Sequence, residues 1–137
     1  MIVHQTLQPE GWVRPRGYAN GIAAQGRLVF TAGIIGWDQN ENFVATDLVG
    51  QFRQVLINTI AVLKEAGAGP EHVVRMTWYL TDRNEYIARG SEIGRIYREF
   101  MGKAFPAMAV VEVSALVEAE AKVEIETIAV IPESSGV

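Results

Sequence analysis

The chain has 137 residues, of which 49% are hydrophobic and 20% are charged. This composition is typical of one globular domain and excludes a disordered chain. The formal net charge is −4, from 16 acidic and 12 basic residues, and it disfavours a broad nucleic-acid-binding surface. The absence of cysteine excludes disulfides, thiolate nucleophiles and thiolate metal sites.

Two further absences concern the location of the protein. No apolar run approaches the roughly 20 residues that a membrane-spanning helix needs. The N-terminus has neither the basic stretch nor the apolar segment of a secretory signal. We therefore expect a cytoplasmic single domain over residues 1–137, with residues 132–137 as a loose tail.

The first third of the chain predicts short strands. The candidates are residues 2–7, 17–24 and 27–31. Gln25-Gly26 lies between the last two candidates and is typical of a hairpin turn. Residues 33–42 combine two glycines with a polar run, so they predict a loop.

A helix is predicted next, between Asp47 and Gly67. Asp47 lies where an N-cap would, and Gly67 followed by Gly69-Pro70 is typical of a helix end. The residues between them form one apolar stripe at helical spacing: Leu48, Phe52, Val55, Leu56, Thr59, Ile60 and Leu63.

The second half of the chain predicts a strand, a turn, a helix and two strands, over residues 74–80, 82–84, 86–101, 107–113 and 122–131. The first of these strands alternates apolar and polar side chains. Gly90 and Gly94 weaken the helix. The predicted order is β-β-β-α-β-α-β-β, an α+β sandwich in which one mixed sheet carries two helices on one face.

The second face of this sheet is also apolar. Residues 107–113 are apolar in both phases apart from Glu112. In the last strand, one phase is apolar throughout, and Ile128 and Val130 make the other phase apolar too. A strand that is apolar on both faces needs cover on both. Because two helices cover only one face, we expect a homo-oligomer built on the other.

Few residues carry recognisable chemistry. The two histidines, His4 and His72, are far apart, and no metal-binding spacing, phosphate-binding loop or serine-hydrolase motif occurs. We therefore expect no metal and no cofactor. Glu126 shares a strand face with Ile128 and Val130, where a partly buried carboxylate would act as a general acid–base or water-positioning group. The alternative role for Glu126 is that of an interfacial hydrogen-bond anchor.

Ordered motifs between Tyr18 and Val130 resemble the RidA/YjgF family. They lie at residues 17–21, 26–35, 51–67, 73–82, 97–100, 105–107, 111–113 and 123–129. The resemblance implies a chorismate-mutase-like fold and a homotrimer with ligand clefts between adjacent subunits. It also implies hydrolysis of reactive imines and enamines, such as 2-aminoacrylate, to a keto acid and ammonia. In that reaction an arginine holds the substrate carboxylate, and a glutamate with backbone groups holds the attacking water.

Four positions depart from the family's deaminase motif. Met108 stands where the motif has its arginine, and Gly94 stands where an asparagine is common. Ala32 and Ile34 replace polar residues on either side of Gly33. The loss of the arginine predicts weak binding of a small amino-acid-derived imine.

The remaining site positions fit the motif. The resemblance places Tyr18, Gly33 and the backbone at Ala109 in the substrate site and gives Glu126 the catalytic role. Arg16 lies just before Gly17-Tyr18 and is the nearest candidate to replace the missing guanidinium.

Two functions remain open from the sequence. We expect hydrolytic deamination of an imine or enamine other than 2-aminoacrylate, such as an aminomuconate-type intermediate of aromatic catabolism. The alternative is a non-catalytic trimer that binds a metabolite in the same clefts. The net charge of −4 and the lack of histidines near matched positions disfavour the ribonuclease activity also attributed to the family. The expected partners are a small molecule and further copies of the chain, without nucleic acid or membrane.

Overall fold

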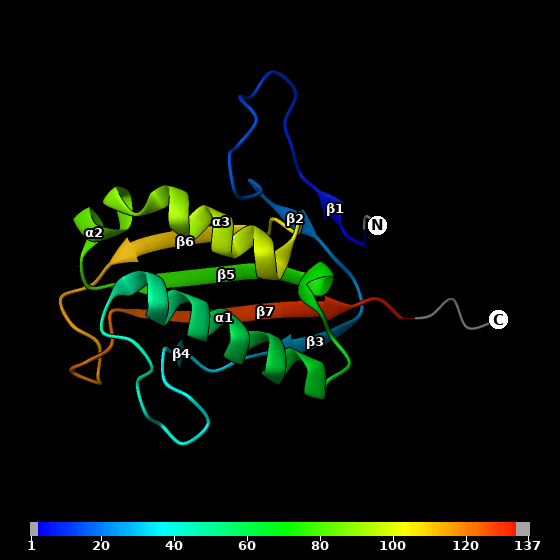
Figure 1. Ribbon diagram of the computed structural model, residues 1–137. Helices are drawn as coiled ribbons and strands as arrows, with labels where there is room; N and C mark the ends of the chain where they lie inside the picture. The colour runs from blue at the N-terminus through cyan, green and yellow to red at the C-terminus, as the bar shows by residue number, and fades with distance from the viewer. Residues whose placement is uncertain (1–2, 134–137) are drawn as a thin grey trace.

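A mixed five-stranded sheet forms the centre of the protein (Figure 1). The computed structural model describes residues 3–133, so most of the predicted tail lies outside the described residues. The strands of the sheet are β3 (Arg27–Phe30), β4 (Ile34–Ile35), β5 (Val73–Leu80), β6 (Ala107–Glu112) and β7 (Val123–Ile131). Their order is β3-β7-β5-β6, with β4 also paired to β7. β5 and β6 run parallel, whereas β7 is antiparallel to its neighbours.

The helices α1 (Leu48–Glu65) and α3 (Gly90–Met101) cover one face of this sheet (Figure 1). The predicted apolar stripe of α1 is its buried side, which packs on β7, β4 and α3. Asp47 is the N-cap residue of α1, but its side chain makes no capping bond. The carboxylate of Glu85 instead accepts a hydrogen bond from the Leu48 N–H at 3.2 Å. No helix among the described residues is long and apolar enough to cross a membrane.

The predicted second helix is divided in two. The helix α2 (Arg83–Ala88) precedes α3, and the break falls at Arg89. The prediction of a turn at residues 82–84 was therefore wrong at its last two residues. Asp82 caps α2, because its Oδ1 accepts hydrogen bonds from the N–H groups of Asn84 and Glu85 at 3.0 and 3.1 Å. A short 3₁₀ helix, η1 (Pro70–His72), leads into β5.

The predicted hairpin at Gln25-Gly26 was wrong. The strand β2 (Ile22–Ala23) pairs with β1 (Gln5–Thr6) in a separate two-stranded sheet, whereas β3 pairs with β7. Gly26 has a φ of 149°, and a Cβ there would lie 2.1 Å from the carbonyl oxygen of Ile131. The glycine thus brings the chain against the end of β7 rather than back onto β2. The segment between β1 and β2 projects from the body (Figure 1).

The two faces of the sheet differ in their cover. Met76, Trp78 and Ile125 point toward the helices and are 0–4% exposed. On the other face, which we call the open face, Leu28 and Phe30 are 60% and 63% exposed. The register places Glu126, Ile128 and Val130 of β7 on this open face, as predicted. The architecture confirms the predicted α+β sandwich, while the homotrimer stays a prediction.

Candidate functional site

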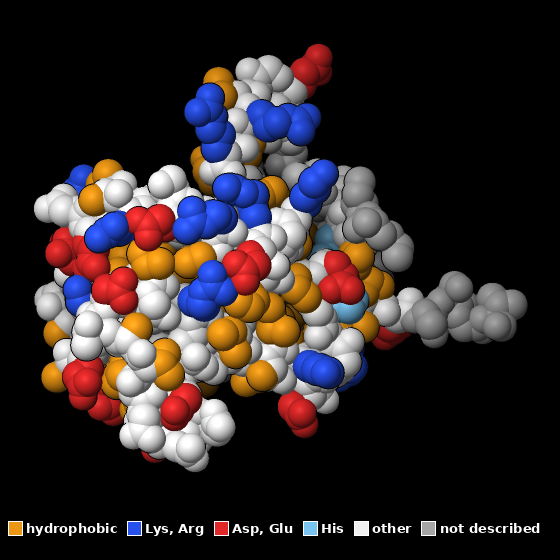
Figure 2. Space-filling model, viewed as in Figure 1, with side chains coloured by type: hydrophobic (Ala, Val, Ile, Leu, Met, Phe, Trp, Pro, Cys, Tyr) orange, Lys and Arg blue, Asp and Glu red, His pale blue; other side chains and the backbone are white. Residues whose placement is uncertain are grey.

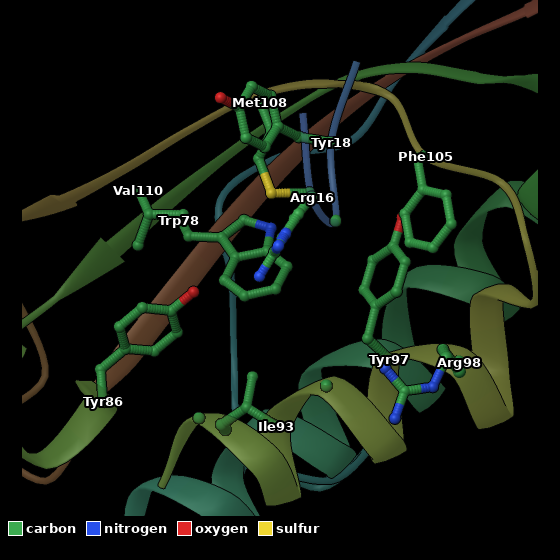
Figure 3. A pocket seen from close by; sticks show the side chains of 13 residues that line it. Arg16, Tyr18, Trp78, Tyr86, Ile93, Tyr97, Arg98, Phe105, Met108 and Val110 are labelled. Atoms are coloured by element: carbon green, nitrogen blue, oxygen red, sulfur yellow. The ribbon is translucent and has the colours of Figure 1, made fainter. Parts of the chain in front are cut away.

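A cavity of about 390 Å³ lies between β5, β6, α3 and the end of the projecting N-terminal segment (Figure 3). Its volume is in the range of small-molecule sites, roughly 300–1,000 Å³. Met108 and Val110 of the edge strand β6 form one wall, and Ile93, Tyr97 and Arg98 of α3 form the opposite one. Figure 3 shows the thioether of Met108 pointing from β6 into this space.

The N-terminal segment is fixed to the edge of the sheet beside Met108. Ala19 forms a bridge with Ala107, and its N–H donates to the carbonyl oxygen of Pro106 at 2.9 Å. Gly17 has a φ of 79°, a conformation that other residues rarely adopt. This turn lets both Arg16 and Tyr18 line the cavity on either side of the glycine.

Aromatic rings make the deep wall of the cavity rigid. The ring of Trp78 lies 4.9 Å from that of Phe52, 6.0 Å from that of Tyr97 and 6.3 Å from that of Tyr86. Tyr97 also stacks on Phe105, with the ring centroids 5.7 Å apart. Such offset and edge contacts hold the rings in place, so the cavity has a defined shape without a ligand.

Two donors in this wall have capacity for a ligand. Trp78 is 4% exposed, and its Nε1–H has no hydrogen-bond partner among the described residues. The phenol oxygen of Tyr86 points toward the centre of the cavity in Figure 3. Burial raises the pKa of Tyr86, so this phenol stays protonated at neutral pH and can donate. A ligand acceptor near Trp78 would satisfy a buried group that the protein leaves unpaired.

The charge of the cavity is positive. Arg16 and Arg98 line it, and none of its lining residues in the described chain is acidic. Neither arginine takes part in the salt bridges found among residues 3–133, which join Arg53 to Glu99, Arg89 to Glu92 and Lys122 to Glu85. Basic side chains gather over α3 and the N-terminal segment (Figure 2). In a chain with net charge −4, this arrangement favours an anionic ligand at this place.

Known proteins are similar to this chain in sequence and fold. The family described as Endoribonuclease L-PSP matches residues 13–131. A RutC family protein of Synechocystis is 39% identical over 135 residues, which cover 96% of this chain and 98% of the relative. The chain belongs to the RidA/YjgF family.

Two further members bear on activity and fold. The Salmonella typhimurium protein named 2-iminobutanoate/2-iminopropanoate deaminase is 34% identical over 113 residues, covering 82% of this chain and 86% of that protein. A Yersinia pestis crystal structure, described as a protein of unknown function of the conserved Rid family, matches with a TM-score of 0.83 at 31% identity. The match covers 94% of this chain and 99% of that one, and it confirms the predicted family fold.

The structure brings only some of the site residues predicted for this RidA/YjgF chain together. Arg16, Tyr18 and Met108 line one cavity, together with Gly94. Ala109 follows Met108 on β6, so its side chain lies on the open face opposite Thr77.

The predicted site residues between β3 and β4 lie elsewhere. Ala32 and Gly33 are exposed in the connection of the two strands, and a Cβ on Gly33 would lie 2.2 Å from Oε2 of Glu124. Ile34 packs against the hydrophobic core opposite Ile125. None of these three residues lines the cavity of its own chain.

Glu126 also lies away from the cavity, on the open face. Its Oε1 accepts a hydrogen bond from the phenol of Tyr79 at 2.8 Å. This bond, with the negative charges of Glu126 and Glu124, raises the pKa of Tyr79. Glu126 is exposed in the single chain, so the burial predicted for it would require a second copy.

Among the cavity residues that the sequence analysis did not assign to a site are Trp78, Tyr86 and Arg98. The sequence placed Trp78 in a predicted strand and Tyr86 and Arg98 in a predicted helix, without a role in binding. The available signal for Arg98 was its spacing, because it lies four residues after Gly94 and therefore on the same side of the helix.

Proposed function

We propose that the cavity binds and hydrolyses a carboxylate-bearing imine or enamine that is larger than 2-aminoacrylate. The observation that carries this proposal is that Arg16 enters the same cavity as Met108. A guanidinium is thereby available although position 108 lacks one. The similarity to a relative named as an imine deaminase supports the reaction class.

The chain's own groups suit such a substrate. Arg16 would pair with the carboxylate, and the N–H of Trp78 would donate to one of its oxygens. Met108, Val110 and Ile93 offer apolar contacts to the rest of the molecule. A cavity of about 390 Å³ is larger than a three-carbon acid requires, so a longer or bulkier side chain is favoured.

The reaction needs only water. An enamine first takes a proton at carbon while its nitrogen loses one, which gives the imine. The oxygen of water then bonds to the imine carbon, the electron pair of the C=N double bond moves to nitrogen, and nitrogen takes the proton that the water loses. The C–N bond of the resulting carbinolamine breaks as the hydroxyl loses its proton and nitrogen gains one, so that ammonia leaves and the ketone remains.

Glu126 would hold the water in an assembly rather than in the single chain. A closed ring of three copies is built from heterologous contacts, in which one surface of a copy meets a different surface of the next. We assign the open face to one side of this contact and the β6 edge beside the cavity to the other. The carboxylate of Glu126 would then approach the cavity of a neighbouring copy and accept a proton from water.

Two classes of imine test the proposal. A dehydratase generates 2-aminoacrylate or 2-aminocrotonate, and an amino-acid oxidase generates the larger 2-imino acids of norleucine or phenylalanine. We expect ammonia release well above the spontaneous rate only for the larger class, and about ten-fold faster turnover of 2-aminoacrylate in Met108→Arg. Turnover of 2-aminoacrylate at the rate of an arginine-bearing relative would overturn the substrate assignment. Binding of the larger 2-imino acids without any acceleration of ammonia release would identify a non-catalytic protein.

A further inference from the structure

The side chain of Arg98 lies over a turn of α3 that lines the cavity and has a glycine at position 94. A Cβ on Gly94 would lie 3.3 Å from Nη1 of Arg98, so the guanidinium rests over the glycine one helical turn before it. Gly90 and Gly94 both line the cavity and contribute no side chain to this wall. The missing side chain at position 94 thus makes room for the guanidinium of Arg98.

The cavity therefore holds two guanidinium groups from different elements. Arg16 comes from the N-terminal segment beside Met108, whereas Arg98 comes from α3 beside Tyr97 (Figure 3). Neither is paired with a carboxylate within the described residues, and the lining contains no acidic residue. Two like charges around one cavity repel each other, and two separate anionic groups on a ligand would relieve this repulsion.

We propose that Arg98 forms a second anion subsite, and that the substrate is an imine or enamine of a dicarboxylic acid. This inference rests on the proposed function and specifies its substrate class. Arg16 would hold the carboxylate next to the reacting carbon, and Arg98 would hold the distal carboxylate. The apolar residues Ile93, Met108 and Val110 would contact the carbon chain that joins the two.

Two stable keto acids of equal chain length test the subsite by calorimetric binding. 2-Oxoadipate and 2-oxohexanoate differ only in the terminal carboxylate. We expect the full-length protein to bind 2-oxoadipate about five-fold more tightly, and Arg98→Gln to remove this preference. Arg95→Gln is the matched control, since Arg95 lies on the same helix but does not line the cavity, and it should keep the preference.

A second variant and a salt series test the subsite even if the Arg98→Gln protein does not fold. Gly94→Ala places a Cβ against the flexible end of Arg98, so it should reduce the preference while the melting temperature stays the same or rises. In the wild-type protein, added sodium chloride should reduce the preference, because Arg98 is an exposed residue and salt screens exposed charges.

The results separate this inference from the proposed function. Equal binding of both acids, or no binding of either, overturns the subsite even if imines are hydrolysed. A preference that survives Arg98→Gln in a folded protein also overturns it. A preference that follows Arg98 in a protein that hydrolyses no imine supports the subsite and refutes the proposed reaction.

Discussion

Both faces of the sheet carry apolar side chains, but the helices α1 and α3 cover only one of them. On the helix side, Trp78, Met76 and Ile125 pack under α1 and α3. On the open face, Leu28 and Phe30 remain largely exposed. The residues of chemical interest divide in the same way, with Arg16 and Met108 at the cavity and Glu126 on the open face. The fold of one chain therefore forms the cavity, whereas the proposed role of Glu126 depends on what covers the open face.

The largest expected effect on folding is on the covered face. Phe52 is 1% exposed and packs on Trp78, so Phe52→Ala should lower the free energy of unfolding by about 3–5 kcal/mol. Val117 is 98% exposed, and Val117→Ala should change it by less than about 0.5 kcal/mol. Urea denaturation measures both variants. Equal stability of the two would contradict the assignment of the core.

A substitution on the open face should change the assembly of the chains rather than the folding of each chain. Light scattering of the wild-type protein should give about three times the mass of one chain. Phe30→Glu places a carboxylate on this face and should bring the mass down to that of one chain, with an unchanged circular dichroism spectrum. Val117→Glu is the control and should stay assembled. A wild-type monomer, or a Phe30→Glu protein that remains assembled, would show that the face has another cover.

A smaller effect is expected at the pair of Tyr79 and Glu126. Removal of the carboxylate in Glu126→Gln should lower the pKa of Tyr79 toward its ordinary value of about 10, measured by ultraviolet titration. The folded protein holds the Tyr79 proton longer than the unfolded chain does. The contribution of Tyr79 to stability is therefore complete below about pH 10, and it is lost as the pH rises through the pKa of Tyr79 in the folded protein.

The same variant separates two roles of Glu126. Loss of turnover by about a hundred-fold in an intact assembly would support a water-positioning role. A loosened assembly with normal turnover per folded site would instead identify a structural anchor. An unchanged Tyr79 pKa would show that the observed hydrogen bond is not made in solution.

The sequence predicted the elements whose pattern is set by local periodicity. The stripe from Leu48 to Leu63 and the alternation along β5 and β7 follow directly from burial on one side. The pairing of β1 with β2 could not be predicted, because Gln25-Gly26 has the composition of a hairpin turn. The actual role of Gln25-Gly26 depends on the close approach of Gly26 to Ile131, two residues that are far apart in the sequence.

The site was predictable only in part, for a similar reason. Motif resemblance selected Tyr18 and Met108, and proximity to Tyr18 in sequence suggested Arg16. Resemblance gave no indication that Glu126 would lie on the opposite face from these three in one chain. The spacing of four residues places Arg98 and Gly94 on the same side of the helix, but it does not show that the guanidinium of Arg98 rests over the glycine.

The most direct test moves the guanidinium within the cavity. The measurement is kcat/KM for the larger imine in Arg16→Gln and in the double variant Arg16→Gln/Met108→Arg. We expect the single variant to lose about ten-fold to a hundred-fold, because it lacks the partner of the substrate carboxylate. The double variant should recover most of this loss, since position 108 faces the same cavity. An Arg16→Gln protein with the wild-type kcat/KM would contradict the account, because no carboxylate would then depend on Arg16.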